Sequence, residues 1–363
     1  MEHYIGIMSG TSLDGIDAVL VVTDGQSIEL KGCANAPIDA PLRERLLALA
    51  GGGAVTAREW GELDAALGQA YADITRQLLA DTGLNATEVR AIGCHGQTVW
   101  HQPDAKLPFS LQLGDGNRIA ALTGIPTVTD FRRKDMALGG QGAPLVPAFH
   151  QRVLAHPERL RIVVNIGGIA NITVLAPERP VLGYDVGPGN MLMDAWCRRH
   201  TGAPYDRNAA LARQGQVLPG LLAHLMAEPW LALPPPKSTG RELFNDVWLD
   251  ARLAGDDAVA DVQATLTEFT AAAIAQQAQA WPTGELLVCG GGGHNPLLME
   301  RLAALLPGWR AATTTEAGVD MDAMEAMAFA WLAHQTLHRL PGSLPEATGA
   351  RRPAVLGALH FPD

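Results

Sequence analysis

Three glycine-rich turns, each preceded by an apolar stretch, are the part of this sequence best suited to chemistry. They lie around Gly10, Gly167 and Gly290. Such turns offer small side chains and free backbone N–H groups, which a phosphate chain needs close by. Together they indicate a nucleotide held between two lobes, with the first two turns at its phosphates and the third against its adenine or ribose. Taken singly, the first turn could be an ordinary hairpin tip and the third a flexible loop.

Asp185 is the candidate general base. It follows a predicted strand, Val181–Tyr184, stands beside a glycine-flanked turn and precedes a predicted helix, Met191–His200. A carboxylate in that place can accept the proton of an attacking hydroxyl or water as a γ-phosphate moves. The alternative is an aspartate that only caps the turn or the helix.

His95, Gln97 and Thr98 form a polar cluster directly after a short predicted strand, Val89–Gly93. In parallel α/β sheets this is the usual position of residues that contact a ligand. The cluster offers hydrogen-bond donors and acceptors within four residues, which suits a sugar-like substrate. A purely structural role for the histidine is the alternative.

Three charged side chains are further candidates for binding a substrate. Arg132 and Arg133 follow the predicted strand Thr127–Phe131 and are suited to a carboxylate, with solvated surface arginines as the alternative. Glu325 lies in a predicted helix, Asp320–Leu340, whose other faces are apolar. A carboxylate in so apolar a helix is expected at a cleft or beside a partner charge.

Two hairpins are expected to position the first two turns. Tyr4–Ile7 and Ile16–Val22 are apolar arms around a polar turn, and Ile162–Leu175 repeats the arrangement in the second half of the chain. Two such hairpins indicate two related half-domains. The glycine- and proline-rich run Gly139–Pro147 predicts the boundary, so the expected domains are 1–140 and 141–363.

The other elements follow from hydrophobic periodicity and its interruptions. Apolar residues at three- and four-residue spacing predict helices, and short apolar runs bounded by turn residues predict strands. The further predicted helices are 56–82, 117–122, 259–281 and one that begins at Pro296. The further predicted strands are 27–34, 111–116, 285–289 and, in an otherwise irregular C-terminal segment, 354–356.

Composition and motif content exclude several classes of protein. The net charge of −11 does not suggest a nucleic acid or an anionic membrane as partner. Four scattered cysteines without a CxxC pair argue against zinc sites and disulfides. A basic leader and a membrane-length apolar run are both missing from the sequence, so a soluble cytoplasmic protein is expected. The sequence also contains neither GxxxxGK[ST] nor a strand-fed GxGxxG.

Eight segments together resemble the anhydro-N-acetylmuramic acid kinase family. They are IGIMSGTSLDGIDAVL, GCHGQTVWH, GDGNRIAALTGIPTVTDFR, GGQGAPLVPAFH, NIGGIANIT, GYDVGPGN, GGGGHNPLLM and DMDAMEAMAFAWLA. The resemblance runs from Tyr4 to about Leu340. The single motifs are shared with other kinases, but SGTSLDGID combined with HGQT, TDFR and DVGPGN is specific to this family.

The resemblance implies an α/β chain with the two-lobed actin-like ATPase (ribonuclease H-like) fold, in which an ATP cleft lies between the lobes. It implies a double reaction with ATP and Mg²⁺ as cofactors. Water opens the 1,6-anhydro ring of anhydro-N-acetylmuramic acid, and ATP phosphorylates O6 to give N-acetylmuramic acid 6-phosphate. Peptidoglycan recycling in a bacterial cytoplasm and a homodimer are also implied.

The motifs and the resemblance together assign residues to these roles. Asp185 is the base that activates the water attacking C1. The residues assigned to ATP are Gly10, Thr11, Ser12, Leu13, Asp14, Gly15, Ile16, Asp17, Gly167, Gly168, Asn171, Gly290, Gly291, Gly292 and Gly293. The residues assigned to the sugar are His95, Gln97, Thr98, Asp130, Arg132, Asn190 and Glu325. Sugar kinases of this fold often carry an aspartate where this chain has Met8, so the metal ligands stay open, with Asp14 or Asp17 as candidate substitutes.

Two other functions are compatible with the residues alone. One is a kinase for an ordinary amino sugar or a small carboxylate on the same fold, which would need no base to activate water at C1. The other is an ATP-switched interaction protein, whose ATP turnover would respond to a protein and not to a sugar. The HGQT and TDFR clusters would have no role in that second case.

Overall fold

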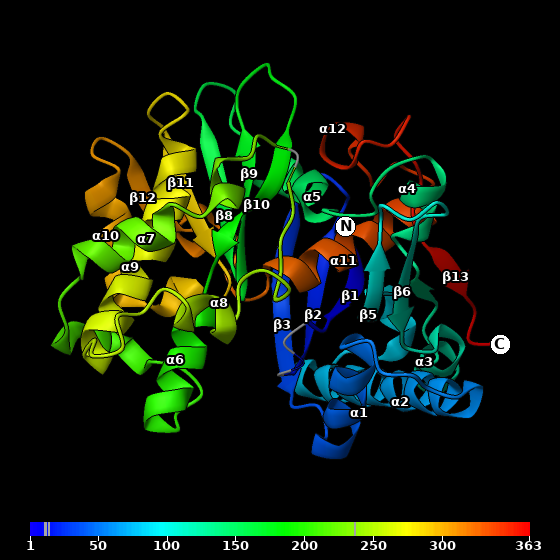
Figure 1. The fold of residues 1–363 in the computed structure, drawn as a ribbon. Coiled ribbons are helices and arrows are strands. Elements are labelled where there is room, and N and C mark those ends of the chain that lie inside the picture. The colour runs from blue at the N-terminus through cyan, green and yellow to red at the C-terminus, as the bar shows by residue number, and fades with distance from the viewer. Residues whose placement is uncertain (11–12, 14, 236) are drawn as a thin grey trace. The chain divides into compact units, whose positions relative to one another are not determined.

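The structure is a computed structural model that describes residues 1–363 except 11, 12, 14 and 236 (Figure 1). The chain divides into two compact units. Unit 1 contains Met1–Val153 and Ala323–Asp363, and unit 2 contains Leu154–Asp322. Each unit is built around its own β-sheet with helices packed on it.

Unit 1 contains a six-stranded sheet and a two-stranded ribbon. The strands are β1 (Glu2–Met8), β2 (Ile16–Thr23), β3 (Ile28–Ala36), β4 (Val89–Cys94), β5 (Gln97–Gln102), β6 (Phe109–Leu113), β7 (Thr127–Thr129) and β13 (Ala358–His360). The sheet order is β13-β7-β4-β1-β2-β3, and β5 pairs with β6. β1, β2 and β3 form an antiparallel meander, whereas β4 and β7 continue the sheet in parallel with β1.

Unit 1 also contains α-helices, several of which pack on its strands. They are α1 (Ala40–Ala50), α2 (Ala57–Thr82), α3 (Gly116–Thr123), α4 (Arg133–Ala137), α5 (Val146–Leu154), α11 (Met324–Leu337) and α12 (Pro345–Thr348). α2 begins with a capping box between Thr56 and Glu59, and it ends at Gly83, whose φ is 69°. Its buried stripe, which includes Leu67 and Ile74, packs on β2 and β3.

α11 packs against β1 and β4 unusually closely. An added Cβ would lie 1.8 Å from the carbonyl oxygen of Ala326 at Gly6, and 2.0 Å from that of Phe329 at Gly93. Successive residues of a strand face opposite sides of a sheet. Gly6 therefore faces α11, while the neighbouring Ile5 belongs to the core cluster on the α2 side. This contact is why the C-terminal segment belongs to unit 1.

Unit 2 is organised around a five-stranded sheet. Its strands are β8 (Arg161–Ile166), β9 (Ile169–Leu175), β10 (Leu182–Pro188), β11 (Glu285–Cys289) and β12 (Arg310–Thr313), in the order β10-β9-β8-β11-β12. Its helices are α6 (Met191–Thr201), α7 (Pro219–Met226), α8 (Asp246–Asp250), α9 (Val259–Ala278) and α10 (Pro296–Leu305). The almost fully buried α9 packs against α6, α7, α10 and β10.

The two units repeat one strand order. In unit 1, β3-β2-β1-β4-β7 is a three-stranded antiparallel meander followed by two parallel strands. In unit 2, β10-β9-β8-β11-β12 has the same order and the same strand directions. Such a repeat is what two related half-domains would show.

The unit boundaries differ from the expected ranges 1–140 and 141–363. They fall after Val153 and after Asp322, because the last 41 residues return to unit 1, where α11 covers the sheet. The glycine- and proline-rich run Gly139–Pro147 lies inside unit 1 and is not the boundary between the units.

Several local predictions are corrected by the structure. The strand predicted at 354–356 is wrong, and β13 instead pairs with β7 a few residues later. β10 does not end at Tyr184 but continues to Pro188, so Asp185 lies within the strand and not after it. α1, β5 and β12 were not predicted.

Candidate functional site

Backbone hydrogen bonds join the second glycine turn to the start of α6. Gly167 and Gly168 connect β8 to β9. The Asn190 N–H donates to the Gly167 carbonyl over 2.8 Å, and the Met191 N–H donates to the Gly168 carbonyl over 3.2 Å. The Asn190 side chain donates to the Ile166 carbonyl over 3.1 Å. The hairpin tip and the first turn of α6 therefore form one fixed corner.

Three glycines around this corner have space that the protein does not fill. An added Cβ would meet nothing among the described residues nearer than 3.7 Å at Gly167, 3.8 Å at Gly168 and 3.7 Å at Gly291. At Gly290 and Gly292 a Cβ would lie only 2.4 Å and 2.3 Å from neighbouring side chains, so packing requires glycine there. At the other three positions glycine leaves the backbone accessible to a ligand.

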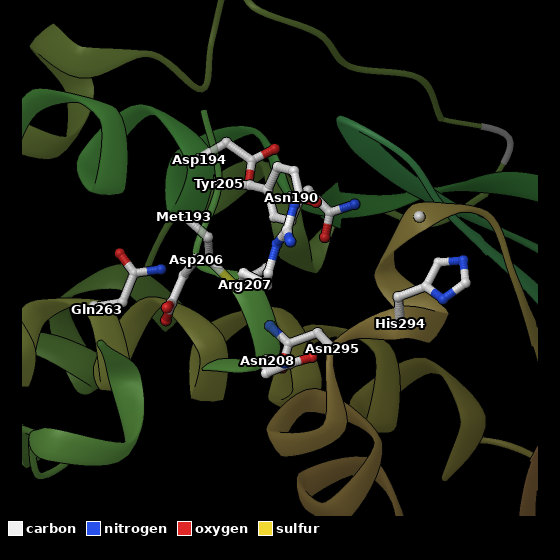
Figure 2. Close-up of a pocket in the computed structure, with 11 residues that line it drawn as sticks. Asn190, Met193, Asp194, Tyr205, Asp206, Arg207, Asn208, Gln263, His294 and Asn295 are labelled. Carbon is white, nitrogen blue, oxygen red and sulfur yellow. The ribbon is translucent and has the colours of Figure 1, made fainter. Parts of the chain in front are cut away.

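A pocket of about 630 Å³ opens beside this corner (Figure 2). Its lining residues are Asn190, Met193, Asp194, Tyr205, Asp206, Arg207, Asn208, Gln263, Gly291, His294 and Asn295. Asn190 and Gly291 connect the pocket to the two glycine turns of unit 2. Figure 2 shows Gln263 and His294 on opposite sides of it, with Arg207 between them. The volume is within the usual range of small-molecule sites.

Gln263 is the most informative lining residue that sequence reasoning missed. Its side chain is fully buried, and neither amide atom has a hydrogen-bond partner among the described residues. Because buried polar atoms are normally paired, this amide can serve a ligand with one donor and one acceptor. The available sequence signal is a glutamine on the buried face of α9, next to Val262.

The loop at 205–208 forms another wall that the sequence did not indicate. The guanidinium carbon of Arg207 lies 6.0 Å from the centroid of the Tyr205 ring. The Asp206 carboxylate accepts hydrogen bonds from the backbone N–H groups of Leu211 and Ala212 at 2.8 and 2.9 Å, which fixes the loop. Nothing in its hydrophobic pattern marks this loop, since only the folded chain brings it to the pocket.

Asp185 lies opposite Asn171 in the β10–β9 ladder. Its Oδ2 accepts a hydrogen bond of 3.0 Å from the backbone N–H of Thr239, and its own N–H donates to the carbonyl of Lys237 over 3.1 Å. Burial raises the pKa of Asp185 to about 6, against the opposing hydrogen bond from Thr239. The carboxylate is thus mostly ionised at pH 7 and still able to accept a proton. Because Asn190 is the N-cap of α6, Asp185 does not cap that helix.

In unit 1 the structure brings His95 and Arg132 together. Nε and Nη2 of Arg132 lie 3.1 and 2.8 Å from Nε2 of His95, and Nη1 donates to the Gly142 carbonyl over 2.9 Å. Burial, with the charge of Arg132, holds the pKa of His95 well below its usual range, so the imidazole is neutral and accepts at Nε2. Burial lowers the pKa of Arg132 to about 10, which leaves it cationic at neutral pH.

The segment that the sequence suggested as a linker supports this pair. The Gly142 N–H donates to Oδ2 of the buried Asp135 over 2.9 Å. Oδ1 of Asp135 accepts from the hydroxyl of Thr348 at 2.8 Å. The carbonyl that holds Arg132 is therefore itself fixed.

Glu325 lies near two charged groups. Burial raises the pKa of Glu325, Asp17 raises it further and Arg132 opposes the rise. Oδ1 of Asp17 accepts a hydrogen bond of 2.6 Å from Asn35, and Asp17 lies opposite Met8 in the β1–β2 ladder. The two carboxylates thus lie in one region at the end of the first hairpin.

Three other predicted sugar-binding residues lie in different surroundings. Gln97 is buried, and its Oε1 has no hydrogen-bond partner among the described residues. The Thr98 hydroxyl accepts from Gln112 over 3.1 Å. Asp130 pairs with Arg133 at 2.7 Å, and the Arg133 side chain is 62% exposed, which fits the surface alternative for this arginine.

Five of the predicted ATP residues of the first turn are described, namely Gly10, Leu13, Gly15, Ile16 and Asp17. Thr11, Ser12 and Asp14 lie outside the described residues. The side chains of Leu13 and Ile16 are buried in the core of unit 1. Any contact that these two make with a nucleotide must therefore use the backbone. In unit 2 the last predicted ATP residue, Gly293, belongs to the 3-10 turn Gly291–His294.

The strand order that both units share defines the class of protein. A three-stranded meander followed by two parallel strands, present once in each unit, is the ribonuclease H-like arrangement of two-lobed actin-like ATPases, as the resemblance implies. The buried carboxylate of Asp185 and the pocket beside the glycine turns add a group that can accept a proton and a cavity that can take a small molecule. These are the parts of an α/β phosphotransferase.

Sequence relatives identify the family. The family model described as anhydro-N-acetylmuramic acid kinase matches residues 2–362. The protein of that name from Vibrio parahaemolyticus is 58% identical, over 99% of this chain and 98% of its own. The one from Vibrio cholerae is 55% identical, over 100% and 99%. The chain belongs to the anhydro-N-acetylmuramic acid kinase family and is therefore a kinase, as predicted.

Solved structures show more distant similarity. The activator of the 2-hydroxyisocaproyl-CoA dehydratase from Clostridium difficile, with bound ADPNP, has a TM-score of 0.46 at 9% identity, covering 91% of this chain and 94% of its own. A ROK family glucokinase from Streptomyces griseus, in complex with glucose and AMPPNP, has a TM-score of 0.43 at 14% identity, covering 92% and 99%. Since neither score reaches 0.5, the family assignment rests on the sequence relatives.

Within the part of the chain that the structure describes, every helix is too short or too polar to cross a bilayer.

Proposed function

We propose that this kinase uses ATP and Mg²⁺ to open the 1,6-anhydro ring of anhydro-N-acetylmuramic acid and to phosphorylate its O6. Water adds its hydroxyl to C1 as the C1–O6 bond breaks, and O6 takes the γ-phosphoryl group. The products are N-acetylmuramic acid 6-phosphate, ADP and a proton. The reaction serves peptidoglycan recycling and amino-sugar catabolism in the cytoplasm, and the enzyme works as a homodimer.

The observation that carries this proposal is the state of Asp185. General-base catalysis is most efficient when the pKa of the base lies near the working pH. Burial raises the pKa of Asp185 to about 6, and a backbone hydrogen bond from Thr239 holds one oxygen in place. The carboxylate takes the proton of the water that attacks C1.

The pocket of unit 2 binds the adenosine part of ATP. The paired donor and acceptor of the buried Gln263 amide match the edge of adenine, and Arg207 and Tyr205 supply a planar wall. The uncrowded backbone at Gly167, Gly168 and Gly291 accommodates phosphate oxygens. Gly10 and the rest of the first turn bind phosphates from the other hairpin.

The His95–Arg132 pair, with Gln97 and Glu325, binds the sugar. Arg132 is cationic, and His95 and the Gly142 carbonyl hold its guanidinium in one orientation. A fixed guanidinium suits a carboxylate, such as that of the lactyl group. Thr98, Asp130 and Asn190 complete the set of predicted sugar contacts.

Asp17 is the candidate Mg²⁺ ligand among the described residues. Its carboxylate oxygens are of the kind that Mg²⁺ prefers. Burial and, to a smaller extent, the charge of Asp17 raise the pKa of Glu325, and a cation at Asp17 would offset that charge. When bound, Mg²⁺ offsets the charge on the phosphate oxygens.

A substrate comparison tests the proposed function. ADP release is measured with purified protein, ATP, Mg²⁺ and either anhydro-N-acetylmuramic acid or ordinary N-acetylmuramic acid. We expect turnover with the anhydro sugar and little with the ordinary sugar. Equal turnover of both would favour a plain amino-sugar kinase, and ADP release that neither sugar stimulates would contradict the proposal.

A further inference from the structure

Three side chains that the proposed reaction does not use meet at one end of unit 1. They are Glu2 at the start of β1, His334 near the end of α11, and His338 directly after that helix. One carboxylate oxygen and one ring nitrogen from each histidine all lie within 4.8 Å of one another. His334 is nine residues beyond Glu325, or roughly 14 Å along the helix. The cluster is therefore separate from the sugar-binding residues of unit 1.

We propose that Glu2, His334 and His338 bind a divalent transition-metal ion of the Zn²⁺ type. Histidines four residues apart lie on one face of a helix. Their ring centroids are 4.3 Å apart, and Nε2 of His338 already lies 2.8 Å from Oε2 of Glu2. Small side-chain rotations suffice to direct the three ligand atoms at one ion.

Neighbouring side chains fix the tautomer of His334 and the orientation of Glu2. Nδ1 of the buried His334 lies 3.0 Å from Oε1 of Gln335, so Nδ1–H donates and Nε2 keeps its lone pair for a metal. The Tyr4 hydroxyl donates to Oε2 of Glu2 over 2.8 Å. Such outer hydrogen bonds orient the ligands of metal sites and fix the tautomer of histidine.

The donor set selects the class of metal. Two imidazole nitrogens and one carboxylate suit Zn²⁺ and related ions, whereas Mg²⁺ and Ca²⁺ prefer oxygen ligands. Three protein ligands leave room for water in a fourth position. Arg90 lies 3.2 Å from Oε1 of Glu2, so the competing arrangement is a metal-free network of Glu2, His338 and Arg90.

Metal binding would clamp the beginning of β1 to the end of α11. A ligand that binds only the folded state raises its apparent stability. We therefore expect Zn²⁺ to raise the thermal midpoint of unfolding, and Mg²⁺ at the same concentration not to do so through this site.

The test is equilibrium dialysis of the full-length protein, without a polyhistidine tag, against Zn²⁺ and separately against Mg²⁺. The variants are Glu2→Gln and His338→Gln, which remove partly exposed ligands and should fold normally. His224→Gln, at an exposed histidine in unit 2, is the matched control. Bound metal is counted by mass spectrometry, and the thermal midpoint is measured in parallel.

We expect one Zn²⁺ per chain in the wild type and in His224→Gln, with at least ten-fold weaker binding in each ligand variant. The Zn²⁺-dependent rise in thermal midpoint should disappear in the same two variants. No stoichiometric Zn²⁺ in the wild type would overturn the site and leave the metal-free network. Unchanged affinity in either ligand variant would overturn it as well.

Discussion

The two units share one strand order but differ in how they affect the charge of their buried ionisable groups. In unit 2, burial raises the pKa of Asp185 to about 6, and the carboxylate keeps its proton-accepting ability. In unit 1, Arg132 is bonded to His95 and to the Gly142 carbonyl, and it keeps its charge while the histidine loses its own. In the proposed function, the same strand order thus carries Asp185 for proton transfer in one unit and Arg132 for binding an anion in the other.

Among the substitutions that test these two roles, we expect the largest effect from Asp185→Asn. Loss of a general base usually costs 10²–10⁴-fold in turnover. We expect a loss in that range, with ADP affinity unchanged within a few-fold, measured by steady-state kinetics and calorimetry. Asp256→Asn, at an exposed aspartate of the same unit, is the control. A variant that retains more than about a tenth of the activity would reject Asp185 as the base.

The unit 1 side of the comparison is tested by Arg132→Lys. The substitution keeps the charge but loses the planar, multiply hydrogen-bonded guanidinium. We expect KM for the sugar to rise roughly 10- to 100-fold, since an ion pair between a guanidinium and the carboxylate of the sugar is worth a few kcal/mol. ADP affinity should stay the same. Arg133→Lys, on the exposed arginine paired with Asp130, should change neither, and equal effects of the two variants would contradict the assignment.

The glycine turns allow a matched pair of substitutions. Gly168→Val puts a side chain where the protein leaves room and where we propose phosphate, so nucleotide affinity should fall about ten-fold, a loss of ~1.4 kcal/mol. Gly220→Val, in α7, places its Cβ where nothing described lies within 4 Å, and it lies outside the proposed site. Calorimetric titration of ADP separates the two. An equal affinity in both variants would mean that this turn does not bind phosphate.

A further expected effect of Asp185→Asn is on the free energy of unfolding. Folding raises the pKa of Asp185, so its favourable contribution is present below the unfolded value of 3.8 and is lost as the pH rises through about 6. Asparagine mimics the protonated form. Asp185→Asn should therefore be more stable than the wild type at pH 8 by about 1–3 kcal/mol, and similar at pH 4. Urea unfolding at both pH values measures the difference in stability between the two proteins. Equal stability of the two at pH 8 would show that burial does not destabilise the charged form of Asp185.

The fold was predictable where apolar periodicity is strong and local. Both hairpins, α2 and α9 follow from such patterns, and the family resemblance extended them to the two-lobed class. α1 was not predicted, although Pro41 lies in its first turn, where proline is compatible with a helix. β13 exists only because β7 offers it a partner far away in the sequence.

The candidate site was predictable in part. Glycine turns and polar residues at strand ends marked Asp185, His95 and Arg132, because those signals are local. The pocket wall from Tyr205 to Asn208, and the buried amide of Gln263, depend on contacts between distant segments. Nor could the sequence tell that packing requires glycine at Gly290 while nothing in the described structure requires it at Gly291.

The proposed attack of water on C1 is tested most directly by mass spectrometry of the product formed from anhydro-N-acetylmuramic acid, ATP and Mg²⁺ in ¹⁸O-labelled water. We expect a phosphorylated, ring-opened sugar that carries one ¹⁸O at C1. N-Acetylmuramic acid 6-phosphate kept in the same water for the same time controls for spontaneous exchange at C1. A phosphorylated product that still holds its anhydro ring, or a ring-opened one with no more label than the control, would contradict the claim that water attacks C1 in this enzyme.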